Sequence, residues 1–183
     1  MKKWIMVIAG LGVMAASAVE VGEKAPPIVA KDQDGNAWEL SGKLGGKHLV
    51  VYFYPAAMTG GCTKQACAYR DHIEKGNATI NVVGISGDTP QNLKWFQTAE
   101  QLNFTLLSDP DGAIAKAYGV AVQTGEKAIQ RTVDGKEVEL KRSATAARWT
   151  FIIDPQGTVV YKDDKAKPIA DLEKVLAFLS KPE

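Results

Sequence analysis

The sequence lacks an excess of charge of either sign. Its 183 residues carry 22 Lys and Arg against 21 Asp and Glu, which leaves a formal net charge of +1, and the two signs are interspersed along the chain. Nucleic acids and acidic lipid surfaces are bound through clustered positive charge, so we expect neither as a partner. Function should therefore reside in a localised site.

Residues that bind metal ions are also scarce. The chain has only two cysteines and two histidines. A structural zinc site of the usual Cys/His kind would need all four of them to converge, and their positions along the chain argue against it. We therefore expect no metal site.

The N-terminus has an apolar run that is too short for a membrane span. Lys2 and Lys3 precede an uncharged stretch of 13 residues, Trp4–Ala16, whereas a spanning helix takes roughly 20 residues. The small residues Ala16-Ser17-Ala18 follow, as a signal peptidase requires. We expect residues 1–18 to be a signal peptide that exports the protein to the periplasm, with no membrane attachment after cleavage; an uncleaved anchor is the alternative.

The remaining chain has no internal repeat, low-complexity tract or linker, so a single domain is expected over residues 19–183. Hairpins are expected around Asp34-Gly35 and Asp134-Gly135, the second spanning about 128–141. Between them strands alternate with helices, which favours an α/β fold: a thioredoxin-like three-layer domain whose mixed central sheet is flanked by helices. The expected strands are 28–31, 36–40, 49–54, 79–86, 104–107, 129–133, 137–140, 149–153 and 158–161, and the expected helices are 59–75, 90–102, 109–119 and 169–179.

One cysteine lies where a buried strand gives way to a helix. Cys62 follows the apolar run 49–54 and falls in the first turn of the expected helix, with Thr59 placed to cap it. Free backbone N–H groups and the positive end of the helix dipole stabilise an anion at this position. The reactive thiolate form of Cys62 should therefore be favoured.

The second cysteine lies on the same helix but on another side. At 100° per residue Cys62, Ala66 and Tyr69 share the stripe that faces the sheet, whereas Cys67 lies about 140° from Cys62. In an intact helix their Cα atoms are roughly 8 to 9 Å apart, beyond the reach of about 7 Å of a disulfide. A Cys62–Cys67 bond would require the helix to unwind. From spacing alone, a non-catalytic domain with a structural disulfide and an exported thiol–disulfide oxidoreductase both remain open.

Residues around Cys62 form a longer pattern, Pro55-Ala56-Ala57-Met58-Thr59-Gly60-Gly61-Cys62. This segment resembles the active-site segment of peroxiredoxins, in which proline, three residues, threonine, two residues and cysteine follow in this order. With Cys67 on the same helix, the chain is similar to the bacterioferritin-comigratory or Q-type branch. The resemblance continues through residues 108–112, 117–120 and 148–154.

This resemblance implies a thiol peroxidase and a role for each matching residue. Cys62 would attack the hydroperoxide and become a sulfenic acid, which Cys67 would resolve into an intramolecular disulfide. Thr59 would align the peroxide, Arg148 would place a positive charge beside the thiolate, and Pro55 would shield it from water. The implied partners are a hydroperoxide substrate and a thioredoxin-like dithiol reductant. The branch needs no prosthetic group, and a monomer is expected.

The chain departs from the family pattern in two places. Gly60 stands where the family commonly has proline, so we expect a looser site that opens more easily. The stretch 120–147 is longer than in compact members of the branch, and its hairpin either docks a partner or forms a solvated edge. The basic residues of this hairpin are Lys127, Arg131, Lys136, Lys141 and Arg142.

Overall fold

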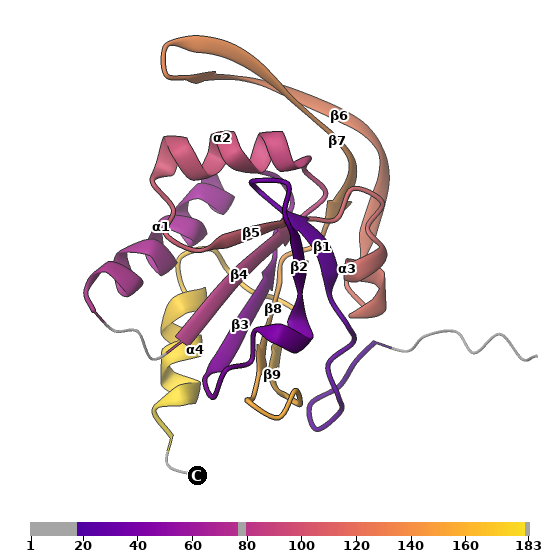
Figure 1. The fold of residues 1–183 in the computed structure, drawn as a ribbon, viewed down its shortest axis with the longest axis vertical. Helices are drawn as coiled ribbons and strands as arrows, with labels where there is room; N and C mark the ends of the chain where they lie inside the picture. The colour runs from indigo at the N-terminus through magenta and orange to yellow at the C-terminus, as the bar shows by residue number, and fades with distance from the viewer. Residues whose placement is uncertain (1–17, 77–79, 182–183) are drawn as a thin grey trace, which may run out of the picture.

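The structure is a computed structural model that describes residues 18–76 and 80–181. The expected signal peptide at 1–18 lies outside these residues except for Ala18. A seven-stranded sheet with the order β2-β1-β5-β4-β3-β8-β9 forms the centre of the molecule (Figure 1). Its strands are β1 (Val29–Asp32), β2 (Ala37–Glu39), β3 (His48–Phe53), β4 (Ile80–Ser86), β5 (Thr105–Ser108), β8 (Trp149–Ile153) and β9 (Val159–Asp163).

The middle of the sheet is parallel and buried on both faces. Strand β3 pairs in parallel with β4, and β4 in parallel with β5. An unbroken apolar run suits such a position because helices cover both faces of a parallel sheet, and Leu49 to Tyr54 are all buried. The expected strand 49–54 is thus confirmed. Strand β8 adds to β3 in the antiparallel direction and makes the sheet mixed.

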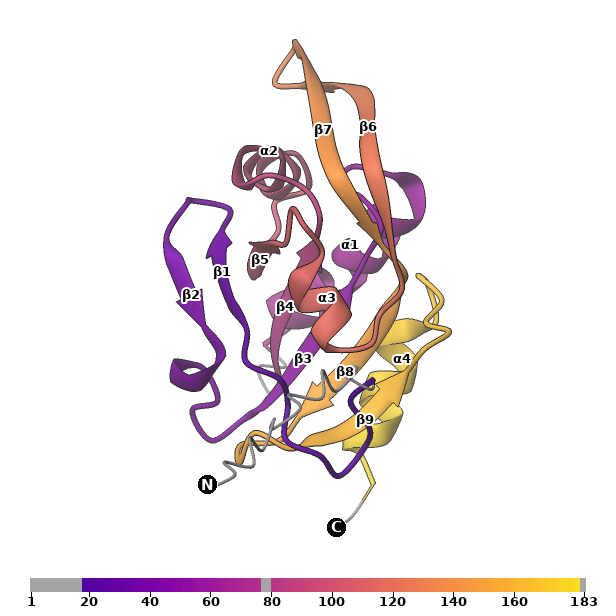
Figure 2. The ribbon, with the colours of Figure 1, turned by 90° about the vertical axis from the view of Figure 1, so that its right-hand side faces the viewer.

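Helices cover the two faces of the sheet unequally. Residues of α1 (Gly60–Glu74), α2 (Pro90–Glu100) and α4 (Asp171–Leu179) pack on one face together with Val50, Tyr52 and Ile152. The short α3 (Ala113–Ala117) and the N-terminal segment pack on the other face, against alternate residues of the same strands (Figure 2). The expected three-layer, thioredoxin-like α/β fold is confirmed.

Local capping explains where the helices begin and end. The Thr89 hydroxyl accepts from the backbone N–H of Asn92 at 3.3 Å, and Pro90 occupies the first turn of α2. The Asp109 carboxylate accepts from the N–H groups of Ile114 and Ala115, at 3.1 and 2.9 Å, in the first turn of α3, which is shorter than the expected helix 109–119. Helix α1 stops before Gly76, whose φ is 76°.

The second hairpin is longer than its sequence indicates. Strands β6 (Val122–Val133) and β7 (Lys136–Ala146) form a separate two-stranded ribbon, which we call the arm. Its turn is where expected: Asp134 and Gly135 have φ values of 49° and 75°, as the two central residues of a type I′ turn require. The expected extent of about 128–141 was too short, because the flanking residues carry few of the β-branched and aromatic side chains that mark a strand. In both views the arm rises past α2 (Figures 1 and 2).

Among the residues that the structure describes, no helix has the length and apolar character needed to cross a membrane.

Candidate active site

Cys62 lies in the first turn of α1, directly after the loop that leaves β3. Its side chain is buried, with 2 % of the residue exposed, and it packs in the cluster that contains Ala66 and Tyr69. The predicted inward orientation is confirmed. Cys67, which helical geometry places about 140° around the helix from Cys62, is half-buried. Both thiols are free and α1 is continuous through both residues, so the structure contains no static disulfide between them.

Arg148 reaches the sulfur of Cys62 from a different part of the chain. Phe53, the last residue of β3, pairs with Trp149, the first residue of β8, so Arg148 lies next to the end of the strand that leads to Cys62. Its Nη2 atom donates to Cys62 Sγ at 3.2 Å. This contact places a fixed positive charge directly beside the sulfur. Trp149, the next residue, packs on the opposite face of the sheet.

Three buried polar residues hold Arg148 in place, and none of them was predicted from the sequence to have this role. The Nη1 atom of Arg148 donates to Gln65 Oε1, and Gln65 Nε2 donates to Asp171 Oδ2 at 2.6 Å. The Tyr69 hydroxyl donates to the same carboxylate oxygen at 2.8 Å. Gln65 and Tyr69 lie three and seven residues after Cys62, a spacing that puts them near its helix face and could have identified them.

The protonation of Tyr69 supports this arrangement. Burial and then the carboxylate of Asp171 raise the pKa of Tyr69 well above its usual range. The phenol therefore stays protonated and remains a donor to Asp171 at any physiological pH. The guanidinium of Arg148 is thus oriented by a chain of side chains that reaches from α1 to the first turn of α4.

Thr59 stands before α1 as expected, but its side chain does not cap the helix. Its backbone is extended, with φ −109° and ψ 144°, and its carbonyl accepts from the N–H of Thr63 at 2.8 Å. The hydroxyl donates to the Ala56 carbonyl at 3.0 Å and accepts no hydrogen bond from α1. The prediction of Thr59 as a side-chain N-cap is therefore wrong. Because the proton is used within the loop, the oxygen keeps its lone pairs for another donor.

The rest of the loop is tied to the sheet. Pro55 is half-buried directly after Tyr54, whose N–H donates to the Ile85 carbonyl at 3.0 Å. The N–H of Ala57 donates to the buried carboxylate of Asp88 at 2.8 Å. These bonds hold the loop that carries Pro55 and Thr59 against the carboxyl ends of β3 and β4.

The two glycines before Cys62 have different surroundings. A Cβ atom on Gly61 would lie 3.2 Å from Pro168 Cγ and 3.5 Å from Arg148 Nη2, so the missing side chain leaves room for the guanidinium. A Cβ atom on Gly60 would have no atom within 4 Å. Proline, the residue common in the resembling family, would therefore meet no obstruction at its Cβ at position 60.

The hydrogen-bond partner of Cys67 is negatively charged, whereas that of Cys62 is positively charged. Its Sγ donates to Glu100 Oε2 at 3.6 Å. Burial and the negative charge of Glu100 raise the pKa of the Cys67 thiol, although Arg70 opposes this effect. At neutral pH Cys67 is consequently a protonated thiol in the reduced protein.

Two other features of the described chain are separate from this site. No group of three or more His, Cys, Asp and Glu side chains within residues 18–76 and 80–181 is arranged to hold a metal ion.

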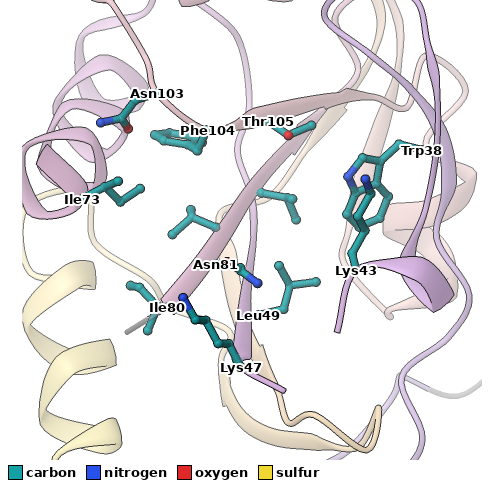
Figure 3. A pocket seen from close by; sticks show the side chains of 12 residues that line it. Trp38, Lys43, Lys47, Leu49, Ile73, Ile80, Asn81, Asn103, Phe104 and Thr105 are labelled. Carbon is teal, nitrogen blue, oxygen red and sulfur yellow. The ribbon is translucent and has the colours of Figure 1, made fainter. Parts of the chain in front are cut away.

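A cavity lies at the amino ends of the parallel strands, between Trp38 and Lys43 on one side and Ile73 of α1 on the other (Figure 3). Since Cys62 follows the carboxyl end of β3, this cavity is at the opposite end of the sheet.

Comparison with known proteins agrees with the geometry. Residues 21–162 match the AhpC/TSA family. The chain is 38% identical over 163 residues to peroxiredoxin Bcp of Escherichia coli, covering 88% of this chain and 96% of that one. It is 39% identical over 163 residues to the chloroplastic peroxiredoxin Q of Populus jackii, covering 88% and 68%.

Solved structures give the same result. The peroxidoxin BcpB of Mycobacterium tuberculosis has a TM-score of 0.70 at 32% identity and covers 87% of this chain and 95% of its own. The bacterioferritin comigratory protein of Xanthomonas campestris has a TM-score of 0.65 at 27% identity and covers 83% and 89%.

A thioredoxin-like fold with a buried cysteine at a helix start, paired with an arginine, defines the class of thiol peroxidases. Within that class, the chain belongs to the AhpC/TSA family and is a peroxiredoxin similar to the Bcp and Q proteins. It is accordingly an enzyme that reduces peroxides with electrons from a thioredoxin-like dithiol.

Proposed function

We propose that the protein reduces hydrogen peroxide and organic hydroperoxides through a sulfenic acid on Cys62. The Cys62 thiolate attacks the terminal peroxide oxygen, the O–O bond breaks, and water or an alcohol leaves. The sulfur is oxidised by two electrons and the peroxide is reduced by two. The structurally similar bacterioferritin comigratory protein of Xanthomonas campestris has alkyl peroxide reduction activity, which supports including organic substrates.

The observation that carries this proposal is the contact between Arg148 and Cys62. The guanidinium lies 3.2 Å from the sulfur and is anchored by Gln65, so its position does not depend on substrate. In this proposal it also stabilises the negative charge that develops on the leaving oxygen. Thr59 accepts a hydrogen bond from the peroxide O–H, and Pro55 helps to exclude water.

Cys67 is the proposed resolving residue. Its sulfur displaces the hydroxyl of the Cys62 sulfenic acid, which leaves as water, and the two sulfurs become linked. This step requires α1 to open, since the two Cα atoms of an intact helix are roughly 8 to 9 Å apart. A thioredoxin-like dithiol then reduces the disulfide. A non-catalytic role is excluded by membership of the family.

The compartment and assembly are part of the same proposal. Residues 1–18 would direct export to the periplasm, leaving one domain at 19–183, and the mature protein would act as a monomer. The reductant would then be a thioredoxin-like protein of that compartment. Cell fractionation and sedimentation of the secreted chain check these points, and a cytoplasmic full-length chain would contradict them.

Mass spectrometry after one equivalent of hydrogen peroxide is the decisive experiment. We expect a Cys62–Cys67 disulfide in the wild type, sulfenic acid on Cys62 in Cys67→Ser, and no peroxide consumption by Cys62→Ser. Rapid consumption of peroxide by Cys62→Ser would contradict the assignment of the nucleophile. Full recycling of Cys67→Ser by a dithiol as fast as the wild type would contradict the assignment of the resolving residue.

A further inference from the structure

The arm is not a free ribbon, because one of its two faces is packed. Alternate residues of β6 and β7 share a face, and on one face Val133 and Leu140 are buried while Ile129 and Val138 are half-buried. Leu140, Ile129 and Val138 pack against the same apolar cluster that contains Cys62. On the other face Ala128, Gln130, Thr132, Glu137, Glu139 and Lys141 are exposed.

The five basic residues of the arm divide between these surfaces. Lys127, Lys136 and Lys141 are exposed, but Arg131 is half-buried and Arg142 is buried. The expectation that the hairpin is simply a solvated edge is therefore wrong for the inner face. Arg131 lies on this face, between Ile129 and Val133 along β6.

Arg131 holds the loop that precedes Cys62. Its Nε atom donates to the Met58 carbonyl at 2.8 Å, and its Nη1 atom donates to the Gln130 carbonyl at 2.7 Å. Met58 has a φ of 55°, a left-handed conformation that is costly for a residue with a side chain. Its carbonyl belongs to the peptide group that joins Met58 to Thr59, so this bond fixes the plane from which α1 begins.

A second connection joins the base of the arm to the same loop. Asn92 Nδ2 donates to the Lys141 carbonyl of β7 at 2.8 Å and to Asp88 Oδ1 at 3.3 Å. Asp88 also accepts from the N–H of Ala57 at 2.8 Å. The base is docked closely, since a Cβ atom on Gly87 would overlap the Ala144 carbonyl oxygen.

We infer that the arm is a clamp on the active-site loop and that Arg131 is a positioning residue that limits how fast α1 opens to form the Cys62–Cys67 disulfide. The inference rests on the proposed function, in which opening must precede resolution. Unwinding the first turn breaks the bond from Thr63 N–H to the Thr59 carbonyl and reorients the adjoining Met58–Thr59 peptide. The Arg131 bond opposes that reorientation while leaving the closed site unchanged.

The clamp acts on one of two competing steps at the sulfenic acid. In resolution, the Cys67 sulfur attacks the Cys62 sulfur, the S–O bond breaks, and hydroxide leaves and takes the Cys67 proton as water. In overoxidation, the sulfenic acid attacks a second hydroperoxide and becomes sulfinic acid, while water or an alcohol leaves. Overoxidation needs no opening of α1, so a slower opening favours it.

Arg131→Ala tests the clamp. Since a hydrogen bond from a charged donor is lost, we expect disulfide formation to become about 3- to 10-fold faster in rapid-quench mass spectrometry. The first oxidation of Cys62 should stay within about twofold of the wild type. Backbone amides of residues 60–63 should exchange hydrogen faster in the reduced protein, and less sulfinic acid should form in excess hydrogen peroxide.

Two further variants make the test specific. Lys136→Ala removes an equal charge from the exposed end of the arm and should change neither step. Arg131→Lys keeps a donor near Met58 and should resemble the wild type more than Arg131→Ala does. Unchanged resolution in Arg131→Ala would overturn the inference, as would an equal effect of Lys136→Ala or an equal change in both steps. Failure of the wild type to form sulfenic acid would instead contradict the proposed function.

Discussion

The two cysteines of α1 lie five residues apart and have oppositely charged neighbours. Cys62, in the first turn of α1, is buried against the guanidinium of Arg148. Cys67, five residues later, is half-buried against the carboxylate of Glu100. The guanidinium donates a hydrogen bond to the sulfur of Cys62, whereas burial and the Glu100 carboxylate raise the pKa of the Cys67 thiol.

The difference is determined by tertiary structure rather than by the helix. Arg148 directly precedes β8, the strand that pairs with β3, and Glu100 is the last residue of α2. Each cysteine therefore takes its character from a residue that is distant in the sequence. Exchanging or removing these partners should change the two thiols separately.

The largest effect is expected from removing the cation. Arg148→Ala should slow the first oxidation of Cys62 by about 100-fold, because one preorganised electrostatic donor to the reacting atoms is lost. Stopped-flow measurement of peroxide consumption checks this, with Lys64→Ala as a control that removes a charge from the exposed side of α1. A rate within threefold of the wild type would remove the electrostatic role of Arg148.

A smaller loss of peroxidase rate is expected from removing Gln65, the acceptor that holds Arg148 in place. Gln65→Leu takes away the acceptor of Arg148 and one donor to the buried Asp171. We expect the first oxidation to slow by about 10-fold and the free energy of unfolding to fall by about 1 to 3 kcal/mol. Denaturant titration beside the kinetic assay separates the two effects. An unaltered oxidation rate would show that Arg148 is positioned without Gln65.

The negatively charged partner of Cys67, Glu100, can be neutralised by substitution. The Glu100 carboxylate raises the pKa of Cys67, so Glu100→Gln should lower it and move the pH profile of Cys67 alkylation to lower pH. In a Cys62→Ser background we expect alkylation at pH 7.5 to become about threefold faster, because a larger fraction of Cys67 is then thiolate. Glu74→Gln, an exposed change on the same helix, is the control. A profile that moves to higher pH would contradict the assigned cause.

The smallest effect, a change in stability, is expected from substituting Gly60, the first residue of α1. Thr59 already has the extended backbone that a following proline requires, and a Cβ at position 60 meets nothing within 4 Å. Gly60→Pro should raise the free energy of unfolding by about 0.5 to 1 kcal/mol in denaturant titration. Gly76→Ala, where φ is 76°, should instead destabilise the protein. A less stable Gly60→Pro would mean that the first turn needs glycine.

Helical periodicity and turn dipeptides predicted the features that local sequence determines. Helical spacing gave the inward side of α1, and both Cys62 and Tyr69 are buried as expected. The turn at Asp134-Gly135 followed from its dipeptide. Arg148 was identified from resemblance to a family, because its proximity to Cys62 depends on the pairing of β3 with β8, which spacing does not determine.

Other parts of the site depend on packing. Helical spacing places Gln65 near the helix face of Cys62, but a glutamine such as Gln65 and an aspartate such as Asp171 are usually solvated on a helix. Only packing shows that both are buried here. Thr59 has the residue type of an N-cap, yet its hydroxyl bonds to Ala56. The contact of Arg131 with Met58 joins residues 73 positions apart and has no local pattern.

The burial of Cys62 also bears on how a protein reductant reaches its sulfur. With 2 % of the residue open to solvent, its sulfur is not reachable by the active site of another protein while α1 is closed. In the cycle proposed above, the opening of α1 after oxidation is the step that makes the sulfur accessible to a macromolecular reductant.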